Sequence, residues 1–350
     1  MRVHVVDPPA YTPPYDHALC AALAQADVDV TLVTARFAHG AVPAADGYRV
    51  DERFYGGTER LPGRARAAAR LARHVPDMLR YRRAARDADV VHFQWLSVPQ
   101  LDRRLLPDRP LVLTAHDVLA REPTPGQRAA QRALLQRMDG VVVHSEHGRA
   151  RLLAETGVEA IVIPHGALPI AAAPARPPEL DEPSRPVVLF FGLIRPYKGL
   201  DVLYEAWRAL APDAELWIVG QPRMEPPPAP PGARVVPRFV SDAEAAWCFT
   251  HADVVVLPYR EIDQSGVLFT ALAFGRAVVL SDVGGFPEVA AAAHVPAGEA
   301  PALATALGLL LGDEAERTRL QAAAREAAAT TYAWPAIAAA HARLYAALTT

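Results

Sequence analysis

Cysteine is scarce in this sequence of 350 residues, which contains only Cys20 and Cys248. The two residues lie far apart, each inside a predicted helix. This spacing fits neither a disulfide framework nor a zinc site. We therefore interpret both as small buried apolar residues.

Long apolar runs and a strong excess of charge are also lacking. No stretch approaches the roughly 18 apolar residues of a membrane span, and the start MRVHVVDPP has neither the apolar region nor the cleavage site of a secretory signal. The formal charge is only -3 and no nucleic-acid-binding motif is present. We expect a soluble cytoplasmic protein that does not bind nucleic acid.

The first strand is followed by DPPAYTPP and not by a G-x-G-x-x-G turn, which disfavours a nicotinamide dehydrogenase. Length instead indicates two domains, because a typical domain has about 100 to 200 residues.

Short β-branched runs alternate with longer Ala- and Leu-rich segments, a pattern typical of parallel sheets with crossover helices. We predict strands at 3–6, 28–33, 90–93, 111–114, 141–143, 161–163, 187–191, 215–219, 235–236, 254–257 and 277–280. The sequence therefore predicts an α/β protein with two Rossmann-like domains whose parallel sheets face a central cleft.

A proline-rich stretch without periodicity separates the two sets of strands. We expect an N-terminal domain over 1–167, a linker over 168–186 and a C-terminal domain over 187–330. The tail is mostly helix-forming, and its last helix, within 331–350, is expected to pack back toward the N-terminal domain.

The stretch FFGLIRPYKGLDVLYEAW joins a strand to a helix and carries Gly192, Arg195, Lys198 and Gly199 between them. In open parallel sheets, ligands bind where strands end at their carboxyl ends. A glycine turn, two cations and a helix N-terminus suit a diphosphate. The alternative is a solvated loop with two surface cations.

A second stretch, DQSGVLFTALAFGRAVVLSDVGG, places Gln264, Ser265 and Gly266 at the start of one helix. The pair Gly284 and Gly285 is expected to open another. Backbone N–H groups at helix starts bind phosphate oxygens. Alternatively, Ser265 caps its helix and the glycines only turn the chain.

These motifs make the second half similar to the donor domain of retaining GT-B glycosyltransferases, the family 4-like "glycosyl transferases group 1" that includes sucrose synthases and phosphatidylinositol mannosyltransferases. The resemblance covers nearly the whole chain. It implicates Arg195 and Lys198 in catalysis and Gly192 and Gly199 in donor binding.

The family's paired glutamates, eight residues apart, fall here on Ile262 and Thr270. We expect a neighbouring acid, Glu261 or Asp263, to supply one carboxylate. The donor contacts implied by the resemblance also include those of the loop and the glycine pair: Gln264, Ser265, Gly266, Val267, Gly284 and Gly285.

Histidines stand at or near strand ends in VVHFQW, VLTAHD, VVVHSEHGR and VIPHG. Such loose spacings do not favour a zinc site. By resemblance, His116 approaches the transferred sugar and is the first catalytic candidate, with Asp117 and Ser145 on the acceptor side. A hydrogen-bonded histidine without substrate contact, and a Ser145 that only caps the next helix, are the alternatives.

The proline-rich loop DPPAYTPPYDHAL is expected to face the acceptor. Its candidate contacts are Tyr11, Tyr15, Asp16 and His17. Nine arginines lie within 60–86, where few acids occur. This helix is predicted either to touch anionic lipid or to be an ordinary solvated face.

The combined expectation is a metal-independent, cofactor-free glycosyltransferase that moves a sugar from a UDP- or GDP-sugar to a lipid-linked or small-molecule acceptor, with retention. It would be bacterial, and cytoplasmic or peripheral at the inner face of the membrane. The alternatives are a sugar-nucleotide epimerase, a phosphorylase, or a degenerate member that only binds nucleotide.

Overall fold

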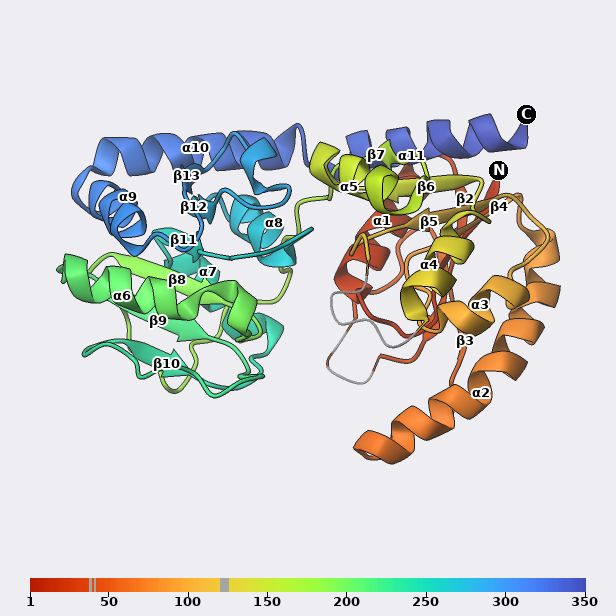
Figure 1. The fold of residues 1–350 in the computed structure, drawn as a ribbon, viewed down its shortest axis with the longest axis horizontal. Helices are drawn as coiled ribbons and strands as arrows, with labels where there is room; N and C mark the ends of the chain where they lie inside the picture. Colours follow the sequence, from red (N-terminus) through yellow and green to blue (C-terminus); the bar gives the residue numbers. More distant parts are fainter. Residues whose placement is uncertain (38–39, 41, 120–125) are drawn as a thin grey trace. The chain divides into compact units, whose positions relative to one another are not determined.

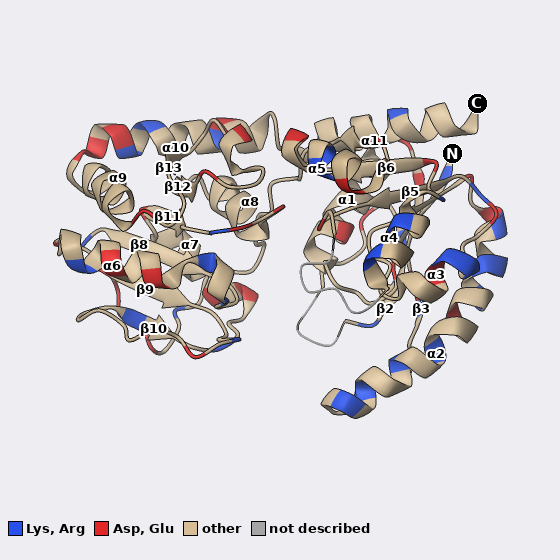
Figure 2. Ribbon diagram, in the orientation of Figure 1, with Lys and Arg blue, Asp and Glu red and all other residues tan. Residues whose placement is uncertain are grey.

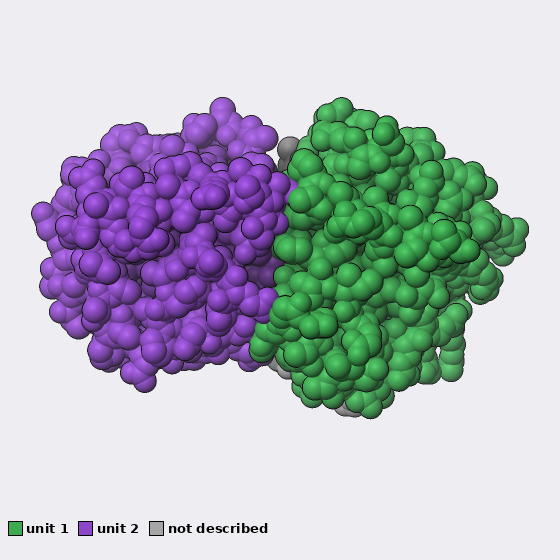
Figure 3. Space-filling view, turned by 90° about the horizontal axis from the view of Figure 1, so that it is seen from above, with its two compact units in different colours: residues 1–166, 334–350 green, residues 167–333 purple. Residues whose placement is uncertain are grey.

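The computed structural model describes residues 1–37, 40, 42–119 and 126–350. The chain forms two compact units, which Figure 3 distinguishes by colour. The first comprises Met1–Gly166 together with Trp334–Thr350, and the second comprises Ala167–Ala333.

The first unit is built on a seven-stranded parallel sheet in the order β3-β2-β1-β4-β5-β6-β7. Its strands are β1 (Arg2–Asp7), β2 (Asp29–Ala35), β3 (Arg49–Phe54), β4 (Val90–Phe93), β5 (Leu111–Thr114), β6 (Gly140–Val143) and β7 (Ile161–Val162). The order reverses between β1 and β4, so the loops that follow these two strands flank the switch point of the sheet.

Helices cover both faces of this sheet (Figure 1). They are α1 (Pro13–Gln25), α2 (Gly63–Ala84), α3 (Pro99–Leu105), α4 (Gln127–Leu135), α5 (Glu146–Thr156) and α11 (Trp334–Thr349), with a 3-10 turn η1 (Ala85–Asp87). One apolar cluster packs helices α1 and α11 against one face of the sheet. A second packs helices α2, α3, α4 and α5 against the other face. The last helix of the chain is therefore part of the first unit's core.

The second unit has a six-stranded parallel sheet in the order β10-β9-β8-β11-β12-β13. Its strands are β8 (Val187–Phe191), β9 (Glu215–Val219), β10 (Arg234–Val236), β11 (Val254–Leu257), β12 (Ala277–Ser281) and β13 (Ala293–Val295). Its helices are α6 (Leu200–Leu210), α7 (Asp242–His251), α8 (Gly266–Ala273), α9 (Ala300–Gly312) and α10 (Glu314–Ala329), with 3-10 turns η2 (Pro196–Lys198) and η3 (Phe286–Glu288). Here the order reverses between β8 and β11.

The predicted strands are confirmed, and β3 and β13 are additional. Both additional strands lie at sheet edges. The sequence of β3, RVDERF, is polar because most of its residues are at least partly exposed, and β13 is only three residues long. Neither resembles the apolar runs of central strands, which explains why they were missed.

Residues 168–186 contain no helix or strand and belong to the second unit, where Leu180 is buried in the core. Both cysteines are free and buried, as predicted. No helix in the described part of the chain is long and apolar enough to span a bilayer.

Candidate functional site

In the second unit, three loops follow the carboxyl ends of the neighbouring strands β8, β11 and β12. The first loop contains Gly192, whose positive φ of +99° suits glycine. It ends at Gly199, where a Cβ atom would lie 1.9 Å from the carbonyl oxygen of Pro258, just beyond β11. The first two loops therefore touch backbone to backbone.

Lys198 is buried, with 7% of its surface exposed. Its ammonium lies 5.0 Å from the centroid of the Tyr259 ring, and a Cβ atom at Gly192 would lie 3.1 Å from Nζ. Among the described residues, the ammonium makes no hydrogen bond or ion pair. A buried cation without an anionic partner is costly, so the geometry favours a bound anion.

The amino-acid composition supports an anion-binding role for Lys198, because it is the only lysine of a chain that has 35 arginines. A compact ammonium fits beside Gly192, where a planar guanidinium would need more room. The single lysine is visible in the sequence and is a signal independent of the motif.

Arg195 precedes Lys198 and is exposed. Its guanidinium makes no hydrogen bond or ion pair within the described part of the protein. Arg260 instead holds the loop. Its guanidinium forms a bidentate ion pair with Asp201 at 2.6 and 2.7 Å, and its backbone N–H donates to the Tyr197 carbonyl at 2.7 Å. The loop is fixed, and Arg195 is left available at its rim.

The loop after β11 gathers polar atoms that lack partners. The Tyr259 hydroxyl and the Gln264 side-chain nitrogen are buried without a hydrogen-bond partner in the described structure. Ser265 is 7% exposed and precedes α8, but its hydroxyl does not cap the helix. Gly266 begins α8, and Val267 lies near Gly192. These groups can receive a polar ligand.

Of the acids near the glutamate positions, Glu261 is exposed and Asp263 is buried. Ile262 is buried, and the Thr270 hydroxyl donates to the Gly266 carbonyl within α8 at 3.0 Å. Thr270 therefore supports the helix.

Gly284 and Gly285 were expected to open a helix, and the helix that follows is the short 3-10 turn η3, with Gly285 as its N-cap. A Cβ atom at Gly284 would lie 1.8 Å from the Ile262 carbonyl oxygen, and φ there is +57°. The close approach of the two loops explains the glycine.

In the first unit, His116 follows β5 and is 8% exposed. Its Nε2 lies 3.0 Å from Gln94 Oε1, and its Nδ1 lies 3.2 Å from His144 Nε2. Trp95 stacks on the ring at 5.1 Å and 13°. Both ring nitrogens are thus engaged within the unit.

His116 belongs to a cluster of five histidines, in which His144 is half-buried and the others, His92, His116, His165 and His341, are buried. The Tyr15 ring packs against three of these residues at 4.7 to 5.7 Å. Burial lowers the pKa of every member, to about 4 for His144 and His341. The cluster is neutral at physiological pH.

The segment expected to be a loop with Tyr15, Asp16 and His17 is instead the first turn of α1, and all three side chains are buried. Proline is well tolerated at a helix start, so the prolines begin this helix at Pro13. Tyr11 remains in the loop, 68% exposed, with its ring 4.8 Å from that of Trp95.

Asp7, at the end of β1, accepts hydrogen bonds from the N–H groups of Tyr11 and Thr12 at 2.5 and 3.2 Å. Burial raises the pKa of Asp7, and burial together with the nearby Asp7 charge raises that of Asp16 well above its usual range. Burial therefore favours the neutral form of Asp16.

Ser145 accepts a hydrogen bond from the Gly148 N–H at 3.0 Å and caps α5, which matches the structural alternative. Asp117 follows His116 and is half-buried. Within the described residues, no group of three His, Cys, Asp or Glu side chains is arranged to hold a metal ion.

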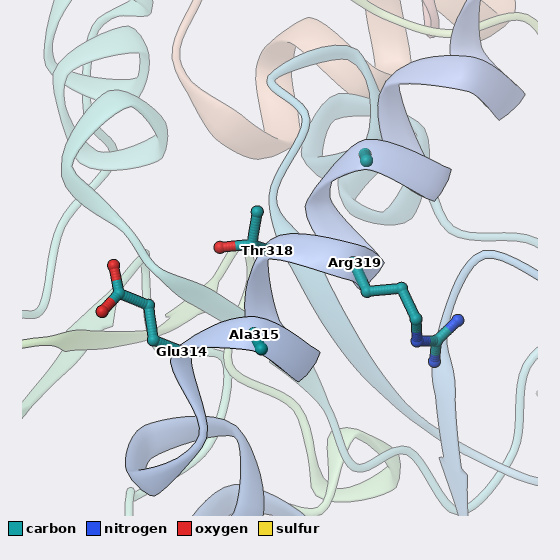
Figure 4. A pocket seen from close by; sticks show the side chains of 5 residues that line it. Glu314, Ala315, Thr318 and Arg319 are labelled. Atoms are coloured by element: carbon teal, nitrogen blue, oxygen red, sulfur yellow. The ribbon is translucent and has the colours of Figure 1, made fainter.

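An open hollow on the second unit is lined by Glu314, Ala315, Thr318, Arg319 and Ala322, all from α10 (Figure 4). It lies on the surface of one helix and gathers no residue of the loops described above. We assign no function to it.

Sequence reasoning missed Gln94, Trp95 and Tyr259. Gln94 and Trp95 directly follow β4 at the switch point, and Tyr259 follows β11. Their positions beyond strand ends were the available signal.

Two family models match the chain: "Glycosyltransferase Family 4" over residues 15–167 and "Glycosyl transferases group 1" over residues 185–313. A phosphatidyl-myo-inositol mannosyltransferase of Mycobacterium leprae is 32% identical over 279 residues, covering 74% of this chain and 73% of the relative. A GDP-mannose:glycolipid 4-β-D-mannosyltransferase of Xanthomonas campestris is 34% identical over 107 residues, covering 26% and 29%.

Solved structures share the fold. The sucrose-phosphate synthase of Thermosynechococcus elongatus superposes with a TM-score of 0.76 at 20% identity, over 99% of both chains. Anabaena HepE, in complex with UDP and glucose, superposes with a TM-score of 0.73 at 17% identity, over 99% of this chain and 100% of that chain. The two parallel-sheet units and these neighbours identify the GT-B fold, and the chain belongs to glycosyltransferase family 4 and is a glycosyltransferase.

Proposed function

We propose that this glycosyltransferase takes its sugar from a nucleoside diphosphate sugar, with UDP- and GDP-sugars as the first candidates. The observation that carries the proposal is the buried Lys198 ammonium without an anionic partner in the described structure. A donor diphosphate supplies such a partner. Related proteins carry GDP-mannose in their name or hold UDP in their structure.

In this proposal, Lys198 binds the diphosphate and stabilises the charge that develops on it as the sugar leaves. Arg195, exposed at the rim, adds a second cation. The Ser265 hydroxyl and the backbone N–H groups at the start of α8 orient the phosphate oxygens. Positive groups of the protein thus do the work that a metal ion does in other enzymes, and no metal is required.

We further propose retention of configuration by a front-face displacement. The bond between the sugar's anomeric carbon and the phosphate oxygen breaks, and the acceptor oxygen bonds to the same face of that carbon. The acceptor proton passes to the departing phosphate. This route needs no carboxylate nucleophile, which agrees with Ile262 and Thr270 at the positions of the family's glutamates.

His116 is proposed to approach the transferred sugar. Since Gln94 and His144 engage both its nitrogens, a sugar hydroxyl must replace Gln94 at Nε2 for direct contact. His116→Ala tests this role: a loss of transfer with intact donor binding supports it, and an unchanged rate leaves His116 as a structural residue.

On the acceptor side, we propose a lipid-linked substrate reached at a membrane surface. Basic residues lie on and beside α2, as Figure 2 shows in blue, and most arginines of 60–86 are exposed. Leu71 and Leu79 of the same helix are 56% and 39% exposed. Cationic and apolar side chains together suit an anionic lipid surface. Vesicles containing phosphatidylglycerol should retain the protein, and neutral vesicles should not.

A triple change of Arg60, Arg64 and Arg83 to glutamine should abolish this retention. The control variant replaces three exposed arginines elsewhere, Arg149, Arg208 and Arg319, by glutamine and so removes the same number of positive charges. Equal retention of both variants would contradict the assignment.

The donor proposal is tested by the thermal stability of the protein with UDP, GDP, ADP and dTDP, with NAD as control. A ligand at 100 times its Kd stabilises the folded state by about 2.7 kcal/mol. Lys198→Met should lose the shift, whereas Arg208→Met, which removes a cation over the Tyr204 ring in the same unit, should keep it. The absence of any shift with the wild type would contradict the proposal.

A further inference from the structure

His116 is held by a chain of hydrogen bonds that begins at a backbone carbonyl. His144 Nδ1 lies 2.9 Å from the Ile163 carbonyl oxygen, and His144 Nε2 lies 3.2 Å from His116 Nδ1. A carbonyl oxygen only accepts, so His144 must carry its proton on Nδ1.

The protonation of the next ring follows from this. Burial lowers the pKa of His144 to about 4, so the ring is neutral near pH 7 and its Nε2 has a lone pair. Nε2 can then only accept, and His116 must donate from Nδ1. The neutral His116 ring therefore carries its lone pair on Nε2.

Gln94 completes the arrangement, because its side chain bridges two histidines. Its Oε1 lies 3.0 Å from His116 Nε2, and its Nε2 lies 3.2 Å from His92 Nε2. An amide can rotate to present either its NH₂ group or its oxygen. Gln94 thus serves His116 whether Nε2 accepts or donates a hydrogen bond.

Neighbouring aromatic rings and hydrogen bonds hold the His116 and His92 rings in their orientations. Trp95 stacks on one face of His116, and Tyr15 meets it edge-on at 4.9 Å. His92 is bound at its other nitrogen by the Tyr345 hydroxyl at 2.6 Å, from helix α11. The rings are closely packed, with His144 half-buried and His92 and His116 buried, as preorganised sites require.

We propose that His144 is a positioning residue that sets the tautomer of His116, with its proton on Nδ1 and Nε2 as the nitrogen that meets substrate. Gln94 follows this choice and turns its NH₂ group toward the unprotonated Nε2. The group recognised there is a hydroxyl of the sugar or acceptor, which donates its hydrogen bond to Nε2 in place of the Gln94 amide. This inference rests on the proposed function of His116.

The tautomer can be read directly from the ¹⁵N resonances of the His116 ring near pH 7.5, without any substrate. The wild type is expected to show a protonated Nδ1 and an unprotonated Nε2. His144→Phe removes the acceptor and should move the proton to Nε2, where Gln94 Oε1 accepts it. His144→Gln offers an amide oxygen and should keep the proton on Nδ1.

Activity gives the second readout. In His144→Phe, kcat should fall about tenfold or more while KM for the donor stays within about twofold, because misorientation affects the reaction step and leaves the donor loops of the other unit intact. His144→Gln should restore most of kcat. His147→Gln, a change at an exposed histidine in α5, should behave as the wild type.

A proton on Nε2 in the wild type, or an unchanged ring pattern in His144→Phe, would overturn the proposal. Equal kcat in folded His144→Phe and wild type would also overturn it. If instead no nucleoside diphosphate stabilises the wild type, the donor proposal fails, and the ring resonances still decide the tautomer.

Discussion

The Lys198 ammonium lies 5.0 Å from the centre of the Tyr259 ring, while the Tyr259 hydroxyl is buried without a partner in the described structure. One residue comes from the loop after β8 and the other from the loop after β11, the two strands that flank the switch point. The cation is held by a ring that does not neutralise it, so its charge stays available to a ligand.

Lys198→Arg is expected to weaken UDP or GDP binding by about tenfold or more, although the charge is kept. A guanidinium is planar and larger, and the space beside Gly192 is tight. Titration calorimetry with each nucleotide measures the effect. Arg208→Lys is the reverse exchange over another tyrosine ring of the same unit and should bind as the wild type does. Wild-type affinity in Lys198→Arg would show that the ammonium is not the phosphate contact.

The two serines at helix starts are expected to respond differently to alanine. Ser145 caps α5, so Ser145→Ala should cost about 1 kcal/mol of unfolding free energy. Ser265 does not cap α8, so Ser265→Ala should leave stability nearly unchanged and weaken nucleotide binding. Urea unfolding and calorimetry on both variants separate the two effects. A stability loss at Ser265 equal to that at Ser145 would indicate a structural role.

Gly199→Ala should destabilise the protein by about 3 kcal/mol, since it combines a strained backbone with a collision. Its φ is +66°, and the new Cβ would lie 1.9 Å from the Pro258 carbonyl oxygen. Gly232→Ala is the matched control, because φ there is +80° but nothing lies within 4 Å. Chemical unfolding compares the two, and similar losses would mean that the loops do not need their close contact.

The buried histidines should make the protein acid-sensitive. Their pKa values are lowered in the folded state, to about 4 for His144 and His341, so the unfolded chain binds more protons once the pH falls below about 6.5. Stability is therefore complete above pH 6.5 and is lost as the pH falls toward 4. The raised pKa values of Asp7 and Asp16 act in the opposite direction.

Urea unfolding at several pH values between 7.5 and 4.5 measures this loss. His341→Gln should reduce its slope by about one proton, because glutamine does not titrate. A stability that stays flat down to pH 4.5 would be incompatible with a neutral buried cluster.

The central strands were predictable because a strand buried on both faces reads as a run of valine and leucine, as in β11 and β12. The edge strand β3 was not predictable from apolar runs, because its exposed residues are polar. The order of β8, β11 and β12 confirms that the loops that follow these three strands share one sheet edge.

Contacts between side chains were harder to predict. The sequence placed histidines near strand ends, but it could not show that Tyr15 and α11 close over them, since α11 lies far along the chain. Nor could it distinguish Ser145 from Ser265. Both precede a helix, and their backbone angles differ, with ψ at 157° for the capping Ser145 and at 109° for Ser265.

The single lysine has a practical consequence. Apart from an α-amino group, Lys198 Nζ is the sole primary amine of the chain, so an acylating reagent or a reductively trapped aldehyde can modify one side chain only. The extent of labelling at that amine then reports how much of the protein in a sample has a ligand bound at the loop around Gly192 and Gly199. A natural sequence of this composition thus already carries the one-site chemical handle that is usually introduced by mutagenesis.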